Sequence, residues 1–389
     1  MFVGPPVLWP GPRHVTVGTA KMSTRVLVVD DTVVFRRIVS EALAGVPGVE
    51  VVGTAANGRL AMARMAALQP DLVTLDIEMP EMNGIEVLEA MATAGMGASV
   101  IVLSSLTVRG GAMTVRALEL GAFDFLTKPE GGSAAANLSD LRGRLLPMVQ
   151  AFERRREIRA LLRGAGSGSP PAEIAPAPPA PAGVPQRPEP RLRRTGPPLV
   201  LIGVSTGGPG ALARLVPSLP ADLGAPVFIV QHMPALFTQP LAASLDKKGA
   251  IRVKEAQDGE AARANWAYVA PGGRHMKLAP DPKGEIVLRI TDDPAENGCR
   301  PAVDYLFRSA ALSFPGRSVA VILTGMGNDG TGGLRLLKRG GCFAIAQDEA
   351  SCVVFGMPKE AIRAGVVDVV APLEMIGAAI VRSVRGAKA

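Results

Sequence analysis

The fold of the first half of the chain is decided by residues 72–84, which read LVTLDIEMPEMNG. A short β-prone run, Leu72–Leu75, leads directly into Asp76 and then into a turn that contains proline, asparagine and glycine. A run of this length bounded by turn residues is typical of a strand in a parallel sheet. Because open α/β sheets bind ligands beyond the carboxyl ends of their strands, we expect Asp76 at a binding edge.

Similar runs recur on both sides of this stretch. Five short strands separated by helices over about 120 residues predict a doubly wound, flavodoxin-like parallel sheet. The expected strands are Arg25–Val29, Val49–Gly53, Leu72–Leu75, Ser99–Leu103 and Asp124–Leu126, and the expected helices are Val33–Ala44, Arg59–Ala67, Ile85–Ala92 and Ala112–Leu120.

The ends of these strands carry groups suited to phosphate chemistry. Strand one ends in Asp30 and Asp31, strand three in Asp76 and strand four in Ser104, and Lys128 follows strand five. A pair of carboxylates 4 Å apart repels by roughly 4 kcal/mol at an effective dielectric of about 20. Mg²⁺ relieves such repulsion by binding oxygen ligands, so the pattern predicts a magnesium site at which Asp76 attacks a phosphoryl donor.

Four motifs of this segment, VLVVDD, LVTLDIEMPEMNG, VIVLSS and FDFLTKP, resemble the response-regulator receiver family over roughly residues 24–130. The resemblance implies an aspartyl phosphate whose charge is sensed by a hydroxyl and a lysine. In this chain it implies Asp76 as phosphoacceptor, Asp31 as direct metal ligand, Asp30 as a ligand acting through water, the Glu78 carbonyl as a third ligand, Ser104 as switch hydroxyl and Lys128 as phosphate partner.

The second half repeats the α/β style after a break in composition. Residues 164–198 are rich in proline, alanine and glycine, which favours an extended tether without a core. We expect strands at Leu199–Gly203, Val227–Val230, Val319–Leu323, Cys342–Ala346 and Val367–Val370, and a β-hairpin over Trp266–Ile290. The expected organisation is a disordered extension (1–22), a first α/β domain (23–145), a helix end and linker (146–198) and a second, mostly parallel α/β domain (199–389).

Charge, cysteine content and hydropathy narrow the class of protein. The formal charge is +7, but nine arginines and only four glutamates lie between Gln150 and Pro197, so the excess falls in the linker and does not predict nucleic-acid binding. The chain contains no run of eighteen apolar residues, so the sequence predicts no membrane-spanning helix. Cys299, Cys342 and Cys352 share no metal-binding or disulfide pattern, so we expect small buried side chains in a cytoplasmic protein.

A candidate nucleophile follows the first strand of the second domain. Gly203–Gly207 reads GVSTG, a G-x-S-x-G string in which Ser205 sits between a strand and a helix. A glycine-rich turn of this kind also cradles phosphates, and it can be purely structural. The turn lacks the lysine of a Walker motif, which weighs against a nucleotide site.

A serine nucleophile needs a base and an orienting carboxylate. The chain has three histidines. His14 lies in the extension, His275 in the expected hairpin, and His232 directly after a buried strand, which makes His232 the candidate base. The run after Val319–Leu323 is glycine-rich and ends at Asp329, the candidate carboxylate, and the Met326 amide is a candidate oxyanion donor.

The motifs GVSTGGP, VQHMP, APGGRHM, RPAVDYLF, LTGMGNDG and QDEASCVVFGMPKEAI are similar to the catalytic domain of the chemotaxis protein-glutamate methylesterase family (CheB) over about residues 199–389. The resemblance implies hydrolysis of glutamate methyl esters on the cytoplasmic helices of chemoreceptors, deamidation of receptor glutamines, and a chemotaxis histidine kinase as phosphodonor. It implies Ser205, His232 and Asp329 as catalytic residues and requires no cofactor in this domain.

Two alternatives stay open at this point. One is a response regulator with a binding output, such as a transcription factor, although residues 199–389 show no helix-turn-helix pattern and no basic helix. The other is a phosphate- or sugar-binding domain built on the glycine-rich turn at Ser205.

Overall fold

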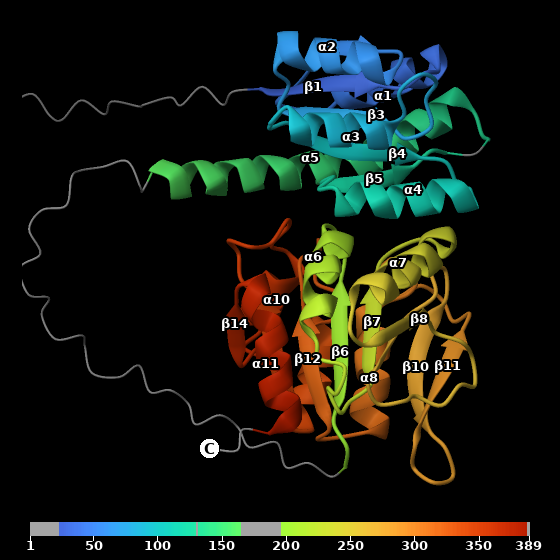
Figure 1. Ribbon diagram of the computed structural model, residues 1–389, viewed down its shortest axis with the longest axis vertical. Helices are drawn as coiled ribbons and strands as arrows, with labels where there is room; N and C mark the ends of the chain where they lie inside the picture. The colour runs from blue at the N-terminus through green and yellow to red at the C-terminus, as the bar shows by residue number, and fades with distance from the viewer. Residues whose placement is uncertain (1–22, 130, 165–195, 387–389) are drawn as a thin grey trace, which may run out of the picture.

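The computed structural model describes residues 23–129, 131–164 and 196–386. It contains two α/β domains that pack against each other, the first in blue to green and the second in yellow-green to red (Figure 1). This confirms the predicted fold class. The expectations for residues 1–22 and for most of the linker lie outside the described residues. Within the described part of the chain, no helix is long and apolar enough to cross a membrane.

The first domain is a five-stranded parallel sheet with strand order β2-β1-β3-β4-β5. Alternate residues of β1 face two separate cores. Leu27 and Val29 pack with residues of α2, α3 and α4, whereas Val26 and Val28 pack with residues of α1 and α5. The elements are β1 (Thr24–Val29), α1 (Val33–Ala44), β2 (Val49–Ala55), α2 (Gly58–Leu68), β3 (Leu72–Asp76), α3 (Gly84–Thr93), β4 (Ser99–Ser104), α4 (Val108–Glu119), β5 (Asp124–Thr127) and α5 (Ala134–Gly164).

Helix α4 begins four residues before the predicted start at Ala112. The side chain of Thr107 caps the helix by accepting a hydrogen bond from Gly110 N at 2.9 Å. Gly110 and Gly111 weaken the helical pattern in the sequence, since glycine is a poor helix former. Both are buried in the structure, and Gly111 lies against the second domain.

The second domain is a seven-stranded sheet with strand order β14-β13-β12-β6-β7-β9-β8, and a separate hairpin is formed by β10 and β11. Every strand pair of the larger sheet is parallel. The elements are β6 (Leu199–Val204), α6 (Gly208–Leu215), η1 (Val216–Ser218), β7 (Val227–Gln231), α7 (Ala235–Lys248), β8 (Arg252–Glu255), β9 (Trp266–Val269), β10 (His275–Pro280), β11 (Ile286–Thr291), α8 (Val303–Ser313), β12 (Ser318–Ile322), α9 (Thr331–Arg339), β13 (Phe343–Gln347), α10 (Met357–Arg363), β14 (Val369–Ala371) and α11 (Leu373–Arg385).

The predicted hairpin over Trp266–Ile290 is wrong in extent. Its first part, β9, pairs in parallel with β7 and β8 and so belongs to the main sheet. Tyr268 of β9 is fully buried and stacks on Phe228 of β7 with ring centroids 5.8 Å apart. The hairpin is confined to β10 and β11, because the Pro271–Gly273 segment is a crossover loop and not a hairpin turn.

Candidate functional site

The carboxyl edge of the first sheet brings together four of the residues singled out in the sequence. Lys128 Nζ lies 2.7 Å from Asp30 Oδ2 and 2.7 Å from Asp76 Oδ2. Oxygen atoms of Asp30, Asp31 and Asp76 all lie within 4.8 Å of one another. Asp30 and Asp76 are buried, whereas Asp31 is exposed at the mouth of the pocket.

The electrostatics of this pocket suit a divalent cation. Burial raises the pKa of Asp76 to about 6, although the neighbouring Lys128 partly offsets that rise. Three carboxylates against one lysine leave uncompensated negative charge, and an all-oxygen donor set of this kind fits Mg²⁺. Glu78 donates its backbone N–H to Asp76 Oδ1 at 3.3 Å, which places Glu78 beside the cluster. Its carbonyl as a metal ligand stays a prediction.

Ser104 ends the neighbouring strand, but its hydroxyl is engaged with α4. Thr114 Oγ1 donates to Ser104 Oγ at 2.7 Å, and Ser104 Oγ lies 3.4 Å from the Gly110 carbonyl oxygen. A phosphoryl group on Asp76 would therefore compete with α4 for this hydroxyl. The contact connects the acid pocket to the helix that faces the second domain.

Ser205 lies at the carboxyl end of β6, in the turn that leads into α6. The turn is fixed by backbone hydrogen bonds from Ser205 N to Thr324 O at 3.0 Å and from Gly208 N to Ser205 O at 2.8 Å. Gly207 has φ +75°, a left-handed conformation that glycine adopts without strain. Gln231 Nε2 donates to Ser205 O at 3.0 Å, which ties the turn to the end of β7.

His232 and Asp329 form a direct pair. Their Nε2 and Oδ2 atoms are 2.8 Å apart, and both side chains are largely buried. Burial disfavours the imidazolium, but the hydrogen bond that His232 donates to Asp329 prevails and raises the pKa of His232 to about 9. Burial likewise opposes ionisation of Asp329, yet hydrogen bonds from His232 and the backbone hold the pKa of this carboxyl below its usual value.

The second ring nitrogen of His232 faces a residue that the sequence did not place in the site. Cys299 Sγ lies 3.6 Å from His232 Nδ1. No hydrogen bond joins Ser205 Oγ to His232 among the residues that the structure describes. The expectation of three small buried cysteines is wrong for Cys299, which is partly exposed, whereas Cys342 and Cys352 are buried.

Met326 lies in the loop after β12, as expected for a candidate oxyanion donor. Within the described ranges its backbone N–H donates to no protein acceptor. The loop closely approaches the serine, because a Cβ added at Gly325 would lie 2.7 Å from Ser205 Cβ. The remaining described histidine, His275, is fully buried, bonds to Pro294 O at 3.0 Å and stacks on Tyr305, which is a structural role.

The first domain covers this second site. Phe125 of β5 and Phe237 of α7 have ring centroids 4.9 Å apart, and the buried Asp124 hydrogen-bonds to Thr206, next to Ser205. Burial raises the pKa of Asp124 to about 6, against the lowering effect of the Thr206 hydrogen bond. Helix α4 faces α6 and α7 across the boundary (Figure 1). Lys248 of α7 pairs with Glu119 of α4 at 2.7 Å.

A second contact lies between α5 and the candidate oxyanion loop. Met326, Val353 and Val354 pack against the apolar cluster of the first domain that includes α5. A cavity of about 300 Å³ separates α5 from these loops, and Arg154 and Arg155 line it.

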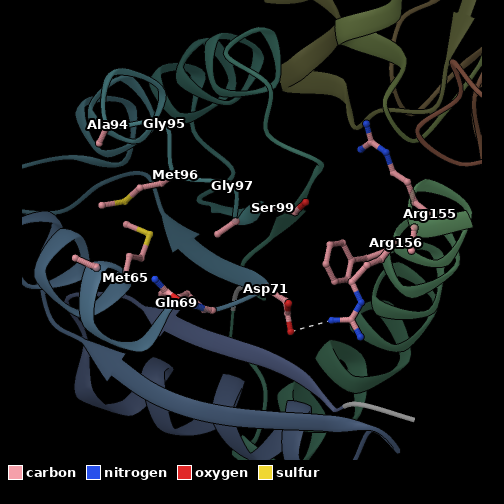
Figure 2. Close-up of a pocket in the computed structure, with 15 residues that line it drawn as sticks. Met65, Gln69, Asp71, Ala94, Gly95, Met96, Gly97, Ser99, Arg155 and Arg156 are labelled. Atoms are coloured by element: carbon pink, nitrogen blue, oxygen red, sulfur yellow. Dashed lines mark ion pairs between the residues drawn. The ribbon is translucent and has the colours of Figure 1, made fainter. Parts of the chain in front are cut away.

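A larger cavity lies at the opposite, amino-terminal edge of the first sheet. It has a volume of about 650 Å³ and is bounded by the loops before β3 and β4 and by α5 (Figure 2). Its only ion pair in Figure 2 joins Arg156 to Asp71 at 2.8 Å. Asp71 precedes β3 whereas Asp76 ends it, so this cavity belongs to neither candidate site.

Comparison with known proteins identifies both domains. The chain matches the response regulator receiver domain over residues 26–137 and the CheB methylesterase model over residues 200–380. The protein-glutamate methylesterase/protein-glutamine glutaminase of Desulfotalea psychrophila is 47% identical over 93% of this chain and 98% of that protein. The chain belongs to the protein-glutamate methylesterase/protein-glutamine glutaminase family. This confirms the family that the motifs predicted, a family of hydrolases with a receiver domain.

Two further proteins are similar to this chain. The protein-glutamate methylesterase/protein-glutamine glutaminase of Bacillus subtilis is 42% identical over 93% of this chain and 98% of its own length. The CheB methylesterase catalytic domain of Thermotoga maritima is 42% identical, with a TM-score of 0.47, and the match covers 48% of this chain and 98% of that domain.

Proposed function

We propose that this protein hydrolyses glutamate methyl esters, and deamidates glutamines, on the cytoplasmic helices of chemoreceptors, with Ser205, His232 and Asp329 as its catalytic residues. One observation carries the proposal: the His232–Asp329 pair, 2.8 Å long, stands next to a serine turn at adjoining strand ends in a member of this family. The names of the relatives supply the substrate class.

The geometry suggests how the reaction proceeds. Ser205 Oγ attacks the ester carbonyl and gives its proton to His232, and His232 then returns that proton to the departing methoxide, which leaves as methanol. Because Asp329 occupies Nε2, the proton must go to Nδ1, the nitrogen beside Cys299. The free Met326 N–H would stabilise the oxyanion, and such a donor is typically worth about 3–4 kcal/mol in the transition state. Water then hydrolyses the glutamyl-enzyme.

We propose that the receiver domain restrains this site until Asp76 is phosphorylated by a chemotaxis histidine kinase. Asp30, Asp31 and Asp76 would hold Mg²⁺, which in a receiver domain supports phosphoryl transfer. A phosphoryl group adds about −1.5 to −2 charges at the pocket. Lys128 would pair with this charge, and Ser104 would turn towards it and away from Gly110 and Thr114. Helix α4 would then shift, and the receptor would gain access to Ser205 in the cytoplasm.

The test is methanol release from methyl-esterified receptor membranes, with and without acetyl phosphate. Wild type should release methanol, faster with acetyl phosphate, and Ser205→Ala should release none. Ser313→Ala, at the far end of α8, is the matched control for loss of a serine hydroxyl and should behave as wild type. Methanol release that persists in Ser205→Ala would reject the serine as nucleophile.

A further inference from the structure

The carboxylate of Asp329 is held by more than its histidine. Oδ2 accepts from His232 Nε2 and from Val303 N at 2.7 Å. Oδ1 accepts from Asp304 N at 3.0 Å, from Gly330 N at 2.9 Å and from Asn297 Nδ2 at 2.8 Å. Four of these donors are backbone amides or the histidine itself. The Asn297 amide is the one side-chain donor besides His232 among the described residues.

Asn297 stands between two carboxylates. Its Nδ2 also donates to Asp304 Oδ2 at 2.9 Å, so each amide hydrogen has its own acceptor. The opposite orientation of the amide would turn its oxygen towards two carboxylates and is electrostatically disfavoured. Asp304 is anchored in turn by Gly333 N at 2.6 Å. The amide therefore screens Asp304 from Asp329 and fixes the orientation of Asp329.

Backbone hydrogen bonds define the turn that carries Asn297. Glu296 and Cys299 exchange backbone hydrogen bonds of 3.1 and 2.9 Å, and both central residues have left-handed φ, +54° at Asn297 and +72° at Gly298. This is the pattern of a type I′ turn, which favours Asn-Gly. Arg308 of α8 holds Glu296 through two contacts of 2.6 and 2.7 Å. The same turn presents Cys299 to His232 Nδ1.

We infer that the Glu296–Cys299 turn positions the His232–Asp329 pair, with Asn297 as the residue that sets how strongly Asp329 holds the imidazole. The inference rests on the proposed function. An amide donor takes up part of the charge on Asp329. Without it the carboxylate is a stronger partner for the imidazolium, so His232 should lose its proton at higher pH and the carboxylate should be less firmly oriented.

An asparagine in a type I′ turn has an ordinary explanation, because it tolerates positive φ. Two substitutions separate that role from the electrostatic one. Gly and Asp are both accepted at this turn position, so Asn297→Gly and Asn297→Asp keep the backbone and change only the group that faces Asp329. Asn265→Gly is the matched control, because Asn265 also has positive φ (+66°) and its side chain bonds Gly224 N, an unrelated contact.

The experiment measures kcat, KM and the pH dependence of methanol release by the full chain with acetyl phosphate. We expect Asn297→Gly to lower kcat about 10-fold with KM unchanged, the scale of one hydrogen bond to a charged group. The pH at which kcat/KM rises should move upward in Asn297→Gly. It should move further, by about one unit, in Asn297→Asp, which adds a negative charge. Asn265→Gly should match wild type.

The outcomes are distinct. A fall in kcat that leaves the pH profile unmoved, or equal effects in Asn297→Gly and Asn265→Gly, would assign Asn297 to the turn alone and overturn the inference. Thermal unfolding midpoints of the variants, compared with that of the control, report any loss of fold separately. Wild type that releases no methanol would instead contradict the proposed function.

Discussion

The two candidate sites lie at the same kind of place, the carboxyl edge of a parallel sheet, but they are assembled differently. In the first domain Asp30, Asp76 and Lys128 each sit on or next to a strand end, and Lys128 contacts both carboxylates at 2.7 Å. In the second domain Asp329 lies seven residues beyond the end of β12, in a loop that backbone amides hold in place. Strand register alone assembles the first site, whereas the second depends on loops.

The difference bears on regulation. The first site is a compact cluster of charges with one exposed member, Asp31. In the proposed function it needs only a cation and a phosphoryl donor. The second is covered by β5 and α4 of the other domain, through Phe125, Asp124 and Glu119. Under the regulation proposed above, a charge added at the first site would control access to the second.

The largest effect on activity is expected from a change at Asp329, in the loop after β12. Asp329→Asn should lower kcat of methanol release by about 10³- to 10⁴-fold, because the amide no longer stabilises the imidazolium or fixes its tautomer. KM should change little. Asp293→Asn, an exposed acid in the loop after β11, is the control. An Asp329→Asn enzyme with near-normal kcat would show that the loop carboxylate is dispensable.

Removing Asp76, the proposed phosphoacceptor of the first site, should uncouple the two sites. Asp76→Ala should abolish stimulation by acetyl phosphate and leave basal methanol release intact, because no phosphoryl group reaches Lys128 and Ser104. Asp140→Ala, on the exposed side of α5, should keep full stimulation. If Asp76→Ala is stimulated as strongly as wild type, control does not pass through this pocket.

Close packing between the domains should be the next most sensitive feature. A Cβ added at Gly111 would lie 2.3 Å from Leu236 O of α7, so Gly111→Ala should push α4 away and raise basal activity several-fold without a phosphodonor. Gly143→Ala in α5 meets nothing within 4 Å and is the matched helix control. Equal basal rates in the two variants would argue against occlusion by α4.

The smallest effect concerns Asp124. Burial raises its pKa above that of a solvated aspartate, and we attribute this burial to the contact with Thr206 of the second domain. On that attribution the docking free energy is most favourable below the ordinary aspartate pKa of about 4 and weakens as pH rises to about 6. Asp124→Asn should tighten docking at neutral pH and lower basal methanol release about two-fold, a change comparable to one neutral hydrogen bond. A higher basal rate of methanol release in Asp124→Asn would contradict this prediction.

The pH profile of wild type follows from His232. Because the imidazole must be neutral to take the serine proton and its pKa is raised to about 9, kcat/KM should increase with pH up to about that value. Measured in wild type and Asp329→Asn, the rise of kcat/KM with pH should move to lower pH when the carboxylate is lost. If the rise stays at the same pH, another group governs it.

The sequence indicated the positions of the candidate residues best where they lie at the end of a strand. Asp76 ends β3, and the residues directly after β5, β6 and β7 are Lys128, Ser205 and His232, so strand order alone brings their neighbours together. It predicted less well where burial arises from tertiary packing. The run at Trp266–Val269 resembles a hairpin strand locally, but Tyr268 and Phe228 draw it into the main sheet.

The contributions of Asn297 and Cys299 could not be predicted from the sequence. Nothing in an Asn-Gly turn indicates that its amide reaches a carboxylate 32 positions later or that its neighbouring thiol faces His232. Such contacts depend on how α8 and the loop after β12 fold back, which periodicity does not report. An Asn-Gly pair in a sequence indicates a turn and nothing about its tertiary contacts.

The proline inside helix α5 affects how the helix can bend. Helix α5 is one continuous helix of 31 residues, interrupted in its hydrogen bonding by Pro147, which has no N–H to donate. Arg155 lies eight residues beyond that proline, or about 12 Å along the axis. A bend of about 10° at Pro147 therefore displaces Arg155 by about 2 Å, more than the tolerance of a hydrogen bond. Pro147, Arg155 and Met326 line the same cavity, so a change in helix direction at the proline would alter how α5 meets the Met326 loop.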